Sequence, residues 1–83
     1  MKFVNIGFGN VVSINKIVSV ISPESAPVKR IVQTAKQDQT LVDATYGRKC
    51  KAVIMTDSGY VVLSALTPET IYSRIDGEEK ISE

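Results

Sequence analysis

Two apolar segments in the second half of the chain restrict its fold more than any other feature. Residues 51–56 and 60–66 are rich in aliphatic side chains, and the Asp-Ser-Gly sequence at 57–59 is typical of a hairpin turn between them. Apolar residues occupy consecutive positions in both segments, whereas successive side chains of a strand point to opposite faces. Both faces of this predicted hairpin therefore need to be covered by other elements or by another molecule.

Shorter strands are predicted on the N-terminal side of this hairpin. Residues 3–6, 11–21 and 40–44 carry the apolar patterns of strands. The second of them breaks the alternation near Asn15, which predicts two hairpin-linked strands rather than one long strand. Residues 7–10, Gly-Phe-Gly-Asn, are predicted to form a turn, because glycine and asparagine tolerate positive φ.

Two helices complete the predicted fold. The first follows the Ser-Pro-Glu-Ser sequence at 22–25, and its apolar residues lie at helical spacing on one face: Val28, Ile31, Val32 and Ala35. A second, short helix starts with Thr67 as the cap and Pro68 at its first position. We expect an α+β fold with a small, mostly antiparallel sheet, one long helix and a short C-terminal helix. The domain spans residues 1–75, and the acidic tail at 76–83, which Gly77 interrupts, is expected to be flexible.

The composition argues against catalysis and metal binding. The chain has 83 residues, no histidine and a single cysteine, Cys50, so an intrachain disulfide or a zinc site is not expected. Cys50 also lacks a candidate base, which disfavours a nucleophilic enzyme. We therefore predict no catalytic residues, no metal, no cofactor and no small-molecule substrate. With no long apolar run and no signal-like N-terminus, we expect a cytoplasmic protein that does not enter membranes.

The predicted hairpin also suggests self-association. One long helix can cover only one of its faces, and an exposed apolar sheet face would favour aggregation. We therefore expect a closed homo-oligomer larger than a dimer, because closure hides the surface in every subunit. The expected contact residues are Phe8, Val61 and Leu63.

A basic turn lies between the strands predicted at 40–44 and 51–56, and it carries the strongest functional signal. Residues 43–51 place three cations within four positions, just after the Tyr-Gly pair at 46–47. Like charges held this close favour an anionic partner, most often a phosphate backbone. Further cations lie early in the predicted helix and at the break near Asn15. The candidate DNA-binding residues are Lys16, Lys29, Arg30, Arg48, Lys49 and Lys51.

Four phrases of this sequence, in this order, resemble the RemA family of small bacterial regulators. They are FVNIGFGNVVS, SPESAPVKRIV, DATYGRKCKAVIM and VVLSALTPET, and the resemblance covers roughly residues 2–75. It implies a ring-forming homo-oligomer that binds duplex DNA and activates biofilm matrix genes. The family's DNA-contacting basic positions match Lys16, Arg48 and Lys49. The family commonly has arginine at the first and third of these positions, and lysine keeps the charge but loses the bidentate fork.

Three other interpretations of the basic turn remain open. It can be a solvated hairpin without a partner. It can contact an acidic protein, if the ring is a structural or protein-interaction scaffold. It can also bind single-stranded RNA, with Tyr46 stacking on a base.

Overall fold

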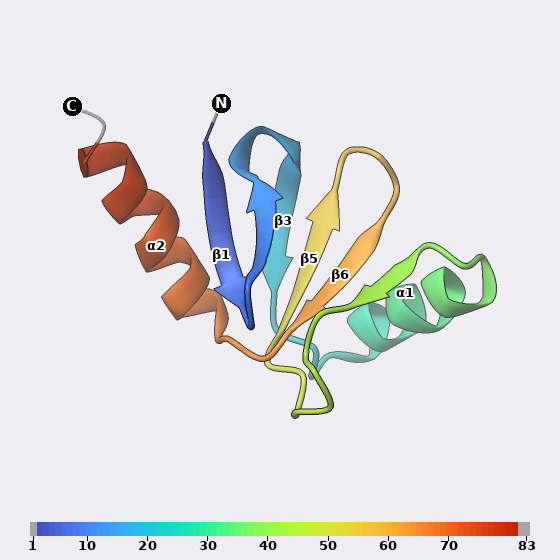
Figure 1. Ribbon diagram of the computed structural model, residues 1–83. Helices are drawn as coiled ribbons and strands as arrows, with labels where there is room; N and C mark the ends of the chain where they lie inside the picture. Colours follow the sequence, from blue (N-terminus) through green and yellow to red (C-terminus); the bar gives the residue numbers. More distant parts are fainter. Residues whose placement is uncertain (1, 82–83) are drawn as a thin grey trace.

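The computed structural model describes residues 2–81, and the side chains of residues 2–76 (Figure 1). Neither helix in this part of the chain is long and apolar enough to span a membrane. The elements, in chain order, are β1 (Phe3–Gly7), β2 (Asn10–Ser13), the 3-10 helix η1 (Ile14–Lys16), β3 (Ile17–Ile21), α1 (Ala26–Gln37), β4 (Leu41–Asp43), β5 (Ala52–Thr56), β6 (Val61–Ser64) and α2 (Pro68–Ile81).

A four-stranded sheet with the order β3-β5-β6-β4 forms the centre of the molecule. Strand β5 pairs antiparallel with both β3 and β6, and β4 pairs parallel with β6. The predicted hairpin is confirmed as β5 and β6, with Ile54 opposite Val62. A separate antiparallel pair, β1 and β2, completes the mostly antiparallel α+β fold that the sequence predicts.

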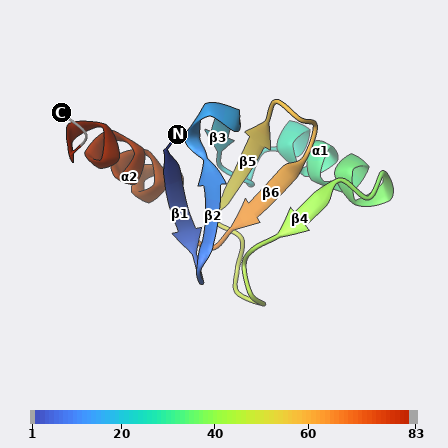
Figure 2. The same cartoon turned by 45° about the horizontal axis from the view of Figure 1, so that its top comes forward.

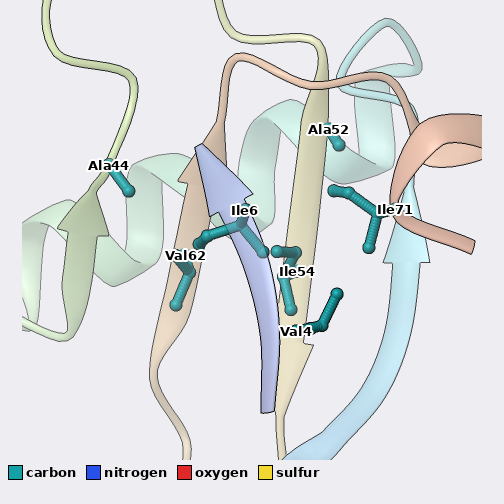
Figure 3. Packing of buried hydrophobic residues seen from close by; sticks show 7 residues of the cluster. All are labelled: Val4, Ile6, Ala44, Ala52, Ile54, Val62 and Ile71. Carbon is teal, nitrogen blue, oxygen red and sulfur yellow. The ribbon is translucent and has the colours of Figure 1, made fainter. Parts of the chain in front are cut away.

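Both faces of the central sheet are covered within the chain. On one face α1 buries Val28 and Ala35 against Val53 of β5 and Val61 of β6. On the other face β1 and α2 supply Val4, Ile6 and Ile71, which pack against Ile54 and Val62 (Figure 3). Helices α1 and α2 accordingly lie on opposite sides of the molecule in Figures 1 and 2. The result is three layers, with the sheet in the middle.

This arrangement corrects the argument for the oligomer contacts. The expectation of an uncovered sheet face was wrong, because the β1–β2 pair and α2 form a third layer over it. Val61 is only 6% exposed and belongs to the core under α1, and Leu63 is half-buried against the same cluster. A charge at Val61 would therefore destabilise the subunit itself instead of reporting on assembly.

The chain changes layers at η1, between β2 and β3. A break near Asn15 is confirmed, but the two strands that it separates do not pair with each other, so the predicted hairpin there was wrong. Strand β2 pairs with β1, and β3 pairs with β5. The short helix redirects the chain from the outer layer into the central sheet, and Ile14 N–H donates to the Lys2 carbonyl at its start.

Both helices begin as the sequence predicts. Ser25 caps α1 by accepting a hydrogen bond from Val28 N–H at 3.3 Å, and Thr67 accepts one from Thr70 N–H at 3.2 Å at the start of α2. The prediction that the second helix is short was wrong, because α2 has 14 residues and α1 has 12. The helix continues past Gly77 because a single glycine costs only about 1 kcal/mol in a helix. Residues 82–83 lie outside the described part of the chain.

Candidate nucleic-acid interface

The segment between β4 and β5, residues 44–51, forms the basic loop, and partly buried polar contacts fix its base. The Asp43 carboxylate accepts hydrogen bonds from Thr45 N–H at 2.9 Å and from the Thr45 hydroxyl at 2.6 Å. These bonds, led by the one from the hydroxyl, lower the pKa of Asp43, so its negative charge is kept at neutral pH. Thr45 is only 3% exposed, and Ala44 N–H donates to the Leu63 carbonyl. The loop therefore leaves the sheet from a fixed starting point.

The tip of the basic loop is a tight turn that exposes an aromatic ring. Arg48 N–H donates to the Thr45 carbonyl at 3.0 Å, and the two residues between them have positive φ, 58° at Tyr46 and 82° at Gly47. Positive φ at both central positions is the pattern of a type I′ turn, which normally favours asparagine, aspartate or glycine. Tyr46 is 82% exposed.

The β1–β2 connection repeats this local structure. Phe8 has φ 54° and Gly9 has φ 78°, and the Asn10 side-chain amide donates to the Gly7 carbonyl at 2.9 Å. The two turns lie at the same end of the molecule, at the bottom of Figures 1 and 2. The Phe8 and Tyr46 rings stack there, with their centroids 5.3 Å apart and an interplanar angle of 21°.

Arg48, a cation of the loop, lies over the Phe8 ring of this aromatic pair. Its guanidinium carbon lies 5.6 Å from the centroid of the Phe8 ring. In the described part of the chain Arg48 forms no salt bridge. A groove of about 520 Å³ opens beside it, and its lining includes Phe8, Arg48, Lys49, Lys51 and Leu66. The groove is thus lined by both cations and apolar side chains.

Two more cations lie near the loop residue Cys50. Lys29 and Arg30, in the first turns of α1, line a second groove of about 410 Å³ together with Cys50 and Leu63. They lie near the positive end of the helix dipole, which adds to the local positive potential. We call Lys29, Arg30, Arg48, Lys49 and Lys51 the basic end.

Cys50 lines the second groove and is not activated as a nucleophile. Burial raises the pKa of its thiol, and the sulfur lies 3.4 Å from the Ala52 carbonyl, to which it donates. The thiol is therefore protonated at neutral pH, in spite of the lysines that flank it in the sequence.

Lys16, another candidate DNA-binding residue, does not lie at the basic end within one subunit. It lies on η1 beside the β5–β6 turn, where its ammonium is 3.9 Å from the Asp57 carboxylate. Strand β5 has five residues and separates this turn from Lys51, a distance of about 17 Å along the strand. The two groups of cations therefore lie at opposite ends of the sheet. Strands β3 and β5 are antiparallel, so the residue before β3 lies at the end of β5 and not at its start.

The stacked aromatic pair is the part of this site that the sequence did not predict. Both turns were expected, but not the contact between them. The available signal was the aromatic-glycine pair in each turn, Phe8-Gly9 and Tyr46-Gly47. Phe8 was expected at a contact between subunits. In the structure it contacts Tyr46 and Arg48 of its own chain. An additional contact with a second copy stays a prediction.

Known proteins with this sequence pattern identify the family. Residues 3–75 match the RemA-like family, described as "Extracellular matrix regulatory protein A-like". The chain belongs to the RemA-like family. The fold and the basic end described above are therefore those of a RemA-like protein.

Relatives of this RemA-like chain match it from end to end. A protein of Bacillus cereus (strain AH187) is 55% identical over 83 residues, which cover 100% of this chain and 95% of the relative. One of Oceanobacillus iheyensis is 57% identical over 83 residues, or 100% and 96% of the two chains. Each carries the name "Putative regulatory protein" followed by a locus label. These names give both relatives a regulatory role.

Proposed function

We propose that this protein is a transcription regulator that binds duplex DNA through its basic end. The observation that carries the proposal is the set of five cations gathered around the basic loop. No salt bridge in the described part of the chain involves any of them. Unpaired cations on one surface attract a polyanion, and duplex DNA carries a negative charge about every 1.7 Å along its axis.

The chemistry of the basic end fits phosphate contacts better than base reading. Three of the five cations are lysines, which bind phosphate as point charges and do not offer the planar fork of arginine. Contacts to phosphates position a protein on DNA without reading its sequence directly. Selectivity would then come from repeated sites and from the deformability of the DNA. The family resemblance makes biofilm matrix genes the first targets to test.

We also propose that the protein acts as a closed homo-oligomer. One subunit offers only a few cations, and Lys16 can join a basic end only if that end belongs to another copy. The outer strands of the sheet, β3 and β4, carry the exposed apolar residues Val18 and Val42. Two different free edges favour head-to-tail contacts, which close into a ring when the rotation fits. Linked contacts around such a ring would raise the affinity for DNA.

The salt dependence of duplex binding tests this proposal. If the assembly contacts roughly 6 phosphates, log K should fall with log salt at a slope of about −5, because bound counterions are released. Fluorescence anisotropy with a labelled duplex at several salt concentrations measures the slope. A flat dependence, or no binding at low salt by a well-folded protein, would refute the proposal and favour a scaffold that contacts an acidic protein.

RNA binding is the second candidate, and the exposure of Tyr46 favours it. A ring that is 82% exposed at the tip of a basic loop can stack on an unpaired base. The same anisotropy assay with single-stranded RNA of matched length distinguishes the two candidates. Tighter binding of the duplex supports DNA regulation, and tighter binding of the single strand, lost in Tyr46→Ala, supports the RNA candidate.

A further inference from the structure

The two aromatic turns at the basic end have an unusual local structure. Phe8 and Tyr46 both adopt positive φ, which side chains with a Cβ rarely do, and each is followed by a glycine with positive φ. Such strain persists only where the surroundings over-determine it, and it is concentrated at functional sites. Both residues are also exposed, 48% for Phe8 and 82% for Tyr46, so burial in the core does not explain their conformation.

Together the two turns give the Phe8 ring two partners. Tyr46 stacks on Phe8, and the Arg48 guanidinium lies over the Phe8 ring. Ser64 fixes the layer that carries Phe8, because its buried hydroxyl donates to the Ile6 carbonyl at 2.8 Å. The Phe8 turn is thus attached to β6 rather than free to move away from the basic loop.

The contact with Phe8 has a direct consequence for Arg48. A guanidinium that rests on an aromatic ring is attracted through its face, while its N–H donors point outward in its plane. The carboxylate of Asp43, at the end of β4 just before the loop, already accepts two hydrogen bonds from Thr45. Arg48 is therefore restrained without being neutralised, and its donors stay available at the rim of the groove.

We propose that Phe8 is a positioning residue that holds Arg48 in the orientation that binds a DNA phosphate. The inference rests on the proposed function and deepens it, because it names a residue without charge as part of the DNA interface. Phe8 acts through Arg48: it lowers the number of conformations that the arginine loses on binding.

A double-mutant cycle in duplex binding tests the inference. The four proteins are the parent, Phe8→Leu, Arg48→Ala and the double variant, compared at a low salt concentration at which Arg48→Ala still binds. Phe8→Leu keeps the apolar bulk and should weaken binding about two- to fivefold in the parent but not in the Arg48→Ala background. Phe8→Tyr keeps the ring face and should bind like the parent.

Two results, one from this cycle and one from light scattering, would overturn the inference. An equal loss from Phe8→Leu in both backgrounds would mean that Phe8 acts independently of Arg48. A lower oligomer mass of Phe8→Leu in light scattering would instead assign Phe8 to a contact between copies. In either case parent binding to duplex DNA is unaffected, so the proposed function would stand without the inference.

A measurement without DNA tests the contact itself. The Phe8 ring current should shift the Arg48 side-chain resonances upfield in NMR spectra of the free protein. The shift should vanish in Phe8→Leu and persist in Phe8→Tyr. Identical Arg48 resonances in the parent and in Phe8→Leu would overturn the inference, whereas failure of the parent to bind duplex DNA would overturn the proposed function.

Discussion

The basic loop and the first turns of α1 both present cations at the same end of the sheet, but they are built differently. Lys29 and Arg30 lie on the polar face of a regular amphipathic helix, whose opposite face buries Val28 and Ala35. Arg48 follows a turn with positive φ and rests on an aromatic ring from another layer. Helical periodicity alone accounts for the α1 cations, whereas it does not account for Arg48.

The α1 cations are thus only accommodated by the fold, whereas Arg48 is restrained by its contacts. A lysine at the start of a helix is slightly unfavourable, by about 0.3–1 kcal/mol, because of the helix dipole. The Arg48 turn instead requires several special contacts and contributes little to the core. Substitution of the exposed cations of the basic loop should therefore change DNA binding with little change in stability, whereas substitution of Lys29 or Arg30 should have only a small effect on DNA binding.

The largest effect is expected for Arg48→Ala. Duplex affinity should fall about tenfold or more, because a charge-assisted contact to phosphate is lost in every subunit. The free energy of unfolding should change by less than about 0.5 kcal/mol, since the side chain is exposed. Lys36→Ala, at the far end of α1, is the matched control for loss of one charge. If Arg48→Ala binds duplex DNA as tightly as the parent, the basic loop is only a solvated hairpin without a role in binding.

Smaller losses are expected for Lys49→Ala and Lys16→Ala, of about threefold each, because lysine binds phosphate through a single point charge. Lys16 is the sharper test, since it lies at the other end of the sheet and can contribute only in an assembly. Its exposed pair with Asp57, with side chains 60% and 50% exposed, should add little stability. If Lys16→Ala weakens binding by a monomeric protein, the account of its position is wrong.

Lys29→Ala should change duplex affinity by less than about twofold, and it should raise stability by a few tenths of a kcal/mol. The gain reflects removal of a cation from the start of α1 and the high helix propensity of alanine. Anisotropy and urea unfolding measure the two quantities on the same sample. A loss of affinity as large as that of Arg48→Ala would remove the distinction between the two regions.

The smallest effect concerns pH and the base of the basic loop. The hydrogen bonds from Thr45 lower the pKa of Asp43, so their stabilising contribution is present above the unfolded value of 3.8 and is lost as pH falls below it. Unfolding by urea at pH 7 and pH 3 should show a larger loss of stability for the parent than for Asp43→Asn, which does not titrate. Equal losses in both proteins would mean that this carboxylate does not anchor the loop.

Local patterns predicted the parts of the fold that depend on neighbours in sequence. The stripe from Val28 to Ala35 and the turn at 57–59 identified α1 and the β5–β6 hairpin, because periodicity and turn chemistry are local properties. The third layer was missed because it depends on Ile6 and Ile71 meeting Ile54, a contact among distant segments. A pattern of apolar positions does not specify which element covers a face.

The same limit applies to the basic end. Arg48, Lys49 and Lys51 lie within four consecutive positions of the sequence, so their grouping was predicted directly. The position of Lys16 depends on strand order, and the stack of Phe8 on Tyr46 depends on two turns from different layers meeting. The aromatic-glycine pairs signalled a local backbone conformation, not a contact.

Hydrogen exchange of the protein with and without duplex DNA tests the central claim most directly. The account predicts that short labelling times reveal new protection in residues 44–51 and 7–10, with less in the first turn of α1. In Arg48→Ala this protection should be largely lost at the same DNA concentration. Protection confined to α2, with residues 44–51 unchanged in the DNA-bound protein, would contradict the account.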